Sequence, residues 1–396
     1  MKKLICLICA AALFLLSGCS GGSIYTNYRE VEQLMVIQTI GFDKDSRGIT
    51  LSVSTGNSGG GTSSSDSSGG SSSGGGSGNA KTSRMSVTAD TVSLAQEKLR
   101  DYSASEELFF AHTSYITVGE DTAREGITPY LIYIGRSTSL REDTPLFIIV
   151  GETANKLILG AGGKDYDATN VLKSLERNLE QRGDCQVFTA SDITANLNQR
   201  DACLITAVKC AKAKNVLDDA ESDELTALPA GYAVIKSGKM VGTLDMGAAR
   251  GVSILQNKLK SCYTDLDVDG EAVALLLENC SCEISPSLSG DKVKSLDVKV
   301  ELSSAMAEAA GEPPLERINR ALEAQAAEWV KSALDAELKY GCDFLGIGSI
   351  LERQKPFKLS GLGESFSDCL RSLSYNINVK AELVRSFDIE NTEGSE

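Results

Sequence analysis

Strand-like and helix-like patterns alternate along most of the sequence, and this alternation restricts the chain to a mixed α/β fold. Residues 375–384 alternate apolar and polar side chains, which predicts a strand with one buried face. Leucines recur at helical spacing over 169–181, and a longer helix is expected to begin after Pro313-Pro314 and end at Gly341. We therefore expect an α+β protein of three mixed α/β domains whose sheets are largely antiparallel or mixed.

Changes in composition divide the chain. Residues 57–79 contain nineteen Gly or Ser in twenty-three positions, too little apolar surface to offset the entropy of ordering, so we expect a disordered insert. The expected units are a signal peptide over 1–18, an N-terminal α/β domain over 19–183, a small middle α/β domain over 184–260 and a C-terminal α/β domain over 261–396.

Two hairpins are predicted. Strand-forming residues over 31–40 and 49–54 flank a stretch from Gly41 to Gly48 that is rich in turn-forming residues. A second pair of strand-like runs within 228–244 is joined by Ser237-Gly238, a compact hairpin signal.

Further elements are expected between the two hairpins. They are a helical pattern over 86–99, a strand over 108–118 and a helix over 123–133. A strand over 185–189 and a helix capped by Ser191 are also expected.

The N-terminal residues predict export. Lys2 and Lys3 precede thirteen mostly apolar residues, too few to span a hydrocarbon core of about 30 Å comfortably. The following Leu16-Ser17-Gly18-Cys19 resembles a bacterial lipobox, so Cys19 is expected to become a lipidated N-terminus that tethers an extracytoplasmic protein to the membrane. The alternative is an ordinary secretory signal with a chance cysteine.

Composition excludes several kinds of site. With 54 acidic and 39 basic residues, the net charge of -15 disfavours binding to nucleic acid. A single histidine, His112, cannot supply a His-rich metal site, and beside Phe109 and Phe110 we interpret it as structural rather than as a partner for a catalytic cysteine. Disulfides are permissible in an exported protein, but the sequence cannot choose among the possible pairings. The cysteines outside the signal and anchor form no CxxC pair, and free or core cysteines are favoured over zinc ligands. They are Cys185, Cys203, Cys210, Cys262, Cys280, Cys282, Cys342 and Cys369.

Two motifs imitate ligand sites. Asp265, Asp267 and Asp269 resemble the start of an EF-hand loop, but Leu276 stands where a bidentate Glu is required, so a strand with solvent-facing carboxylates is favoured over calcium binding. Residues 160–163 are glycine-rich without the spacing of a phosphate-binding loop. We therefore expect no catalytic residue, no metal site and no cofactor. Gly41 and Asp43 are attributed to turn formation.

Several segments, in their order along the chain, resemble one family. They are the lipobox at Cys19, Arg29–Leu34 running into Ile40-Gly41-Phe42-Asp43-Lys44-Asp45, Leu108–His112 followed by Gly119–Ile127, Gly231–Leu244, and Asp343–Gly348 followed by Lys355-Pro356. This order resembles the Ger(x)C family, the lipoprotein C-subunits of spore nutrient-germinant receptors. The sequence departs from the family pattern in lacking two tryptophans, in carrying Ile235 in place of Phe, and in the Gly/Ser insert.

The resemblance implies a non-enzymatic subunit of a membrane germinant receptor, required for nutrient-triggered germination. It implies a lipid anchor on the outer face of the spore inner membrane and contacts with membrane-embedded A- and B-type subunits. The alternative is an extracytoplasmic solute-binding lipoprotein that feeds a transporter, for which two similar lobes around a cleft would be expected. An exported hydrolase is a third class and would require a titratable pair in a cleft.

Overall fold

The computed structural model describes residues 34–55, 83–103, 107–161, 167–214, 221–289, 292–309, 311, 313–356, 366, 370 and 373–385. The signal peptide over 1–18, Cys19, the Gly/Ser insert and Cys369 lie outside the described residues.

An eight-stranded mixed sheet forms the larger part of the molecule, in the order β10-β9-β8-β7-β6-β2-β3-β4. Its four central strands, β8, β7, β6 and β2, pair in parallel, and the flanking pairs are antiparallel. The strands are β2 (Thr39–Asp45), β3 (Gly48–Ser54), β4 (Arg84–Ala89), β6 (Tyr115–Gly119), β7 (Leu146–Val150), β8 (Ala202–Lys214), β9 (Glu221–Lys236) and β10 (Lys239–Leu244).

Helices cover both faces of this sheet, because its central strands are apolar on both sides. Phe147 and Ile149 pack toward one face with α5 (Ala154–Gly160), α6 (Ala168–Arg182) and α8 (Met246–Leu255). Leu146 and Ile148 pack toward the other, with α2 (Val92–Tyr102), α3 (Glu120–Glu125), α4 (Thr128–Arg136) and α7 (Ala190–Arg200). A separate parallel pair joins β1 (Leu34–Val36) to β5 (Glu107–Phe109).

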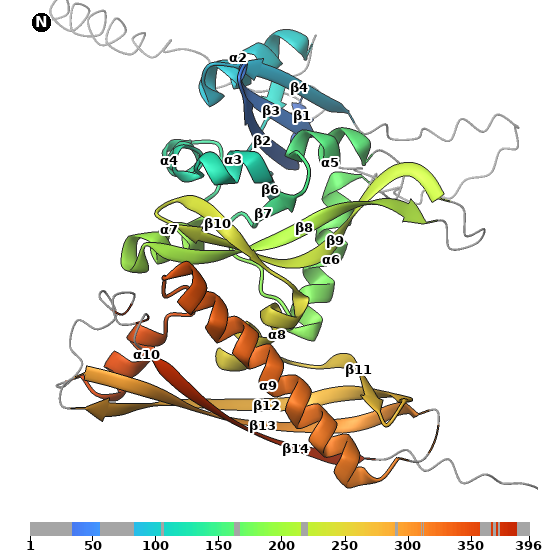
Figure 1. The fold of residues 1–396 in the computed structure, drawn as a ribbon. Coiled ribbons are helices and arrows are strands. Elements are labelled where there is room, and N and C mark those ends of the chain that lie inside the picture. Colours follow the sequence, from blue (N-terminus) through green and yellow to red (C-terminus); the bar gives the residue numbers. More distant parts are fainter. Residues whose placement is uncertain are drawn as a thin grey trace, which may run out of the picture.

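A four-stranded mixed sheet, in the order β11-β12-β13-β14, forms the C-terminal part. Its strands are β11 (Cys262–Val268), β12 (Glu271–Ser289), β13 (Lys292–Ala309) and β14 (Ser374–Arg385). The helix α9 (Leu315–Tyr340) crosses this sheet and buries a stripe that includes Ile318, Leu322 and Trp329. Figure 1 shows α8 between the two sheets, and α8 contacts α9, β9 and β12. A short helix, α10 (Ile347–Gln354), follows α9.

The mixed α/β class predicted from the sequence is confirmed. The helix over 169–181, the hairpin turning at Ser237-Gly238, the helix that begins after Pro314 and the final strand over 375–384 are also found where expected. The alternation of exposed and buried residues in β11 places Asp265 and Asp267 on its solvent face.

Other local predictions were wrong. The turn expected from Gly41 to Gly48 is only the Ser46-Arg47 tip, because strand pairing extends to Asp45 and Gly48. The 86–99 segment begins in strand β4, and the 108–118 segment is broken between β5 and β6. The 123–133 helix is divided at Gly126, whose φ of 144° is incompatible with a helix.

Two further predictions, both near residue 190, were wrong. Residues 185–189 form only an isolated bridge, Pro145 to Thr189. The helix after them is capped by Thr189, in a capping box with Asp192, rather than by Ser191.

The boundary expected at residue 184 lies inside a continuous sheet. The β7 strand, from the first expected unit, pairs in parallel with β8 from the second. The boundary expected at 260 coincides with the start of the second sheet at β11. The three-unit division stays a prediction. Of the helices in the described part of the chain, none is both long and apolar enough to cross a membrane.

Candidate functional site

The β9–β10 hairpin, residues 231–244, is where several of the sequence motifs meet, and we call it the central hairpin. Its turn has positive φ at Ser237 (49°) and Gly238 (72°), the geometry that matches the twist of the flanking strands. At its base Gly231 has a φ of 89°, and a Cβ there would collide with the carbonyl oxygen of Leu244. Glycine is therefore required at this position.

The tip of the central hairpin is bound to the N-terminal part of the chain. The backbone N–H of Ile127 donates to the carbonyl of Gly238 at 2.8 Å. The Ser237 N–H donates to the carbonyl of Asp201 at 2.9 Å, and its hydroxyl donates to Asp201 Oδ2 at 2.6 Å. These hydrogen bonds attach the turn of the central hairpin both to the corner between α3 and α4 and to the C-terminal end of α7.

The other side of the central hairpin is bound to the end of α9. Lys236 Nζ donates to the carbonyls of Gly341 at 2.8 Å and Tyr340 at 3.3 Å. A cation at this position also complements the negative end of the helix dipole. The Tyr340 ring occupies the space that a Cβ on Gly242 would need, and its hydroxyl donates to the Thr243 carbonyl at 3.3 Å.

Two buried carboxyl groups organise the segment after α9. Asp343 accepts from the N–H groups of Ile347 and Gly348, at 2.8 and 2.9 Å, and so caps α10. Glu337 accepts from the N–H of Leu345 at 2.8 Å and shares a hydrogen bond with Asp343. Burial raises the pKa of Glu337 well above its usual range, and the neighbouring Asp343 carboxylate adds to the rise. Burial also raises the pKa of Asp343, but its hydrogen bonds from Gly348 and Ile347 oppose that rise, so we assign the proton of the pair to Glu337.

Asp43 has a structural role that the sequence did not reveal. It lies within β2 rather than in a turn, is 8% exposed, and accepts from the N–H groups of Ala154 at 2.9 Å and Asn155 at 2.7 Å. It thus caps α5 from a strand 111 residues earlier in the sequence. Burial raises the pKa of Asp43, and these two backbone hydrogen bonds oppose the rise. A Cβ on Gly119 would collide with its carboxylate, which accounts for that glycine.

Gly41 was likewise attributed to turn formation, and this attribution was wrong. It lies in β2, and a Cβ there would be 2.6 Å from Ile158 Cδ1. The glycine allows α5 to approach the sheet.

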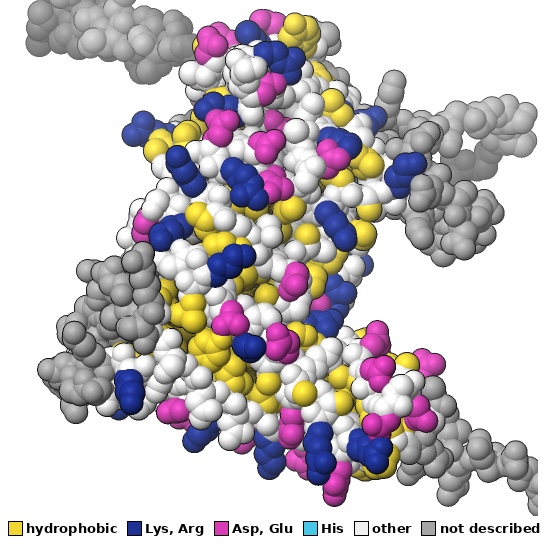
Figure 2. Space-filling model, viewed as in Figure 1, with side chains coloured by type: hydrophobic (Ala, Val, Ile, Leu, Met, Phe, Trp, Pro, Cys, Tyr) yellow, Lys and Arg dark blue, Asp and Glu magenta, His cyan; other side chains and the backbone are white. Residues whose placement is uncertain are grey.

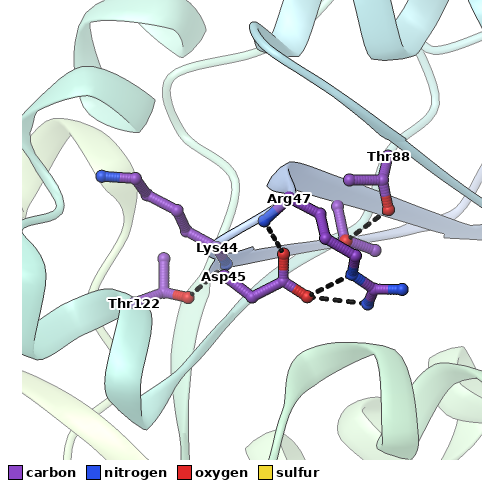
Figure 3. Close-up of polar contacts among 6 residues, drawn as sticks. Lys44, Asp45, Arg47, Thr88 and Thr122 are labelled. Atoms are coloured by element: carbon purple, nitrogen blue, oxygen red, sulfur yellow. Dashed lines mark hydrogen bonds and ion pairs between the residues drawn. The ribbon is translucent and has the colours of Figure 1, made fainter.

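The charged tip of the β2–β3 hairpin is also held by local contacts (Figure 3). Lys44 N–H donates to Thr122 Oγ1 at 2.8 Å, and Asp45 accepts from the backbone and guanidinium of Arg47. Lys44 Nζ lies 2.8 Å from Glu125. The Asp43-Lys44-Asp45 motif is thus used in capping and hairpin closure.

The remaining candidate residues are dispersed. His112 is exposed and packs against Phe109, with ring centroids 5.4 Å apart. The cysteines of the described chain are free thiols, and Cys280 and Cys282 are partly buried and both pack toward the core from one face of β12. Burial raises the pKa of Cys262 to about 11 and that of Cys185 to about 12, so both are thiols near neutral pH.

Within the described ranges, no three His, Cys, Asp or Glu side chains gather as a metal site would require. On the face in Figure 2, Lys and Arg side chains are interspersed with Asp and Glu rather than gathered into one basic patch.

Comparisons with known proteins identify the class. Residues 27–209 match the family model described as "Spore germination protein N-terminal domain", and residues 230–387 match "Spore germination B3/ GerAC like, C-terminal". The chain therefore belongs to the Ger(x)C family of spore germination proteins. The crystal structure of the GerBC protein has a similar fold, with a TM-score of 0.56, 14% identity, and coverage of 87% of this chain and 96% of that chain. No curated protein gives a significant match.

Proposed function

We propose that this protein is the lipid-tethered C-subunit of a nutrient-germinant receptor and acts without catalysing a reaction. In this proposal Cys19 carries the lipid, the body lies at the outer face of the spore inner membrane, and its surfaces contact membrane-embedded A- and B-type subunits. The observation that carries the proposal is the match to both family domains, which together span most of the chain.

The central hairpin supports a role as a rigid adaptor. Contacts from α4, α7 and α9 converge on it, so the two sheets are joined by hydrogen bonds as well as by packing through α8. A force or contact at one sheet would be transmitted to the other, because packed elements joined in this way do not deform independently. A tether would also raise the effective concentration of such a body near membrane partners.

Substitution of the expected lipid-acceptor cysteine, Cys19, tests the proposed membrane tether. Membranes from spores that express the wild type, Cys19→Ala or Cys9→Ala would be fractionated and immunoblotted. Cys9 lies inside the expected signal peptide and serves as the matched control. We expect the wild type and Cys9→Ala in the inner membrane, and Cys19→Ala released or lost. Retention of Cys19→Ala in the membrane would reject the tether.

Partner contact is tested separately by co-purification with the A- and B-type subunits from detergent-solubilised spore membranes. Wild-type protein that is anchored but repeatedly recovered alone would reject the adaptor role and favour a solute-binding lipoprotein.

A further inference from the structure

A cleft of about 590 Å³ opens between α4 and α7, beside the tip of the central hairpin. The two helices run antiparallel. Thr128, at the start of α4, lies against Gly238, and Asp201, at the end of α7, is bonded to the adjacent Ser237. Arg136, the last residue of α4, therefore lies at the opposite end of the cleft, about 12 Å from Thr128 at 1.5 Å per residue.

The middle of the cleft is apolar. Leu131 and Leu197 line it, and Ile132, which also lines it, is 47% exposed. Gly135 also lines the α4 side of the cleft. An apolar side chain entering from solvent would find apolar surface on both helices.

The two ends carry opposite charges. Asp201 provides a carboxylate that is bonded through Oδ2 to the Ser237 hydroxyl. At the other end, the Arg136 guanidinium forms no hydrogen bond or ion pair with any residue that the structure describes. The Glu142 carboxylate also stands near this end, because its Oε1 would lie 3.3 Å from a Cβ on Gly135.

We propose that this cleft binds a short extended oligopeptide of three or four residues with free termini. Its amino group would lie at Asp201, its carboxylate at Arg136, and an apolar side chain between Leu131 and Leu197. The spacing selects this class, because an extended peptide spans about 3.3–3.6 Å per residue and three or four residues match the length of the cleft. A single amino acid carries both charges on one carbon and cannot reach both ends. The inference goes beyond the proposed function and does not depend on the anchor.

The test is calorimetric titration of the detergent-solubilised full chain with the peptide Ala-Leu-Leu-Ala, in free form and with acetylated and amidated ends. We expect millimolar or tighter binding of the free peptide, at least tenfold weaker binding of the blocked one, and no binding of leucine. Arg136→Ala and Asp201→Asn should each weaken binding at least fivefold. Asparagine tolerates the left-handed φ of 55° at residue 201, so this variant should fold, and its thermal midpoint would be checked.

Arg141→Ala is the matched control, because Arg141 is an exposed arginine paired with Asp143 and lies outside the cleft. It should bind like the wild type. No heat with the free peptide at millimolar concentration would overturn the proposal, as would equal binding of leucine. Equal binding of the blocked peptide would also overturn it and would indicate docking of a protein segment through apolar side chains alone.

Discussion

Glu337 provides the sharpest prediction, because a buried acid with a raised pKa makes folding depend on pH in a defined direction. Glu337 is 1% exposed, hydrogen-bonded to Asp343, and accepts from the N–H of Leu345. An unfolded glutamate releases its proton near pH 4.3, whereas the folded one keeps it to higher pH. Between these values the folded state binds more protons than the unfolded state, so this group lowers stability as pH rises.

The magnitude follows from the linkage slope. Each pH unit above the unfolded value, and below the raised folded pKa, removes up to about 1.4 kcal/mol of stability. Glu337→Gln removes the titration but keeps both hydrogen bonds, since the amide oxygen can accept from Leu345 and the amide NH₂ can donate to Asp343. The stability of this variant relative to the wild type should therefore rise from pH 5 to pH 8. Glu337→Leu leaves the Leu345 N–H and the Asp343 carboxyl without this partner and should lower the free energy of unfolding by about 2–4 kcal/mol throughout this pH range.

Urea unfolding at pH 5, 6, 7 and 8, followed by circular dichroism, would measure both variants against the wild type. Asp43 and Asp184 also have raised pKa values but are not among the groups that shift Glu337, so their titration largely cancels in the difference. Asp343 is hydrogen-bonded to residue 337, so the pH dependence that is measured belongs to this pair. A difference between Glu337→Gln and the wild type that does not change with pH would refute the assignment of the proton to Glu337.

Three further substitutions test the capping and hairpin contacts. Gly231→Ala should cost more than about 3 kcal/mol or prevent soluble expression, because strain at positive φ adds to a backbone collision. Gly151 also has a positive φ, 76°, but has open space around it, so Gly151→Ala should lower the free energy of unfolding by only about 1 kcal/mol. Thermal unfolding of both variants would measure the difference. Asp43→Ala should lose about 2–4 kcal/mol by orphaning two N–H groups of α5, and a urea midpoint no lower than that of exposed Asp45→Ala would contradict this role. Lys236→Met removes the hydrogen bonds to the end of α9 and should make that end more mobile. Limited proteolysis should then cleave the C-terminal sheet faster, with little change in the eight-stranded sheet. Equally faster cleavage of both sheets would argue against a role of Lys236 in joining them.

Helices and turns were predicted correctly where the residues that specify them are close together in the sequence. The helix that begins after Pro314 was predicted because a preset start, an apolar stripe and a stop glycine all lie within it. The turn at Ser237-Gly238 was predicted because two-residue hairpins require particular backbone conformations. The glycine at 126 and the strand pairing through Asp45 were misjudged, since tertiary pairing decided where one element ended and the next began.

The candidate site shows the limit of such patterns. Glu337 extends the apolar stripe of α9 after Ala333 and Leu334, and this spacing was the one available signal that its carboxyl is buried. Nothing in the sequence near Lys236 indicated that it would reach the end of α9, 105 residues later.

The sequence by itself determined the class of fold and the family, because composition, periodicity and ordered motifs can be read along the chain, and the anchor at Cys19 stays a prediction. Only the tertiary structure decided that Asp43 caps α5, that the motif segments converge on the central hairpin, and that α4 and α7 enclose a cleft with opposite charges at its ends. The physical reason is that these contacts join residues far apart in the sequence. Their energy depends on distance and burial in the folded chain, which leave no periodic trace in the order of the residues.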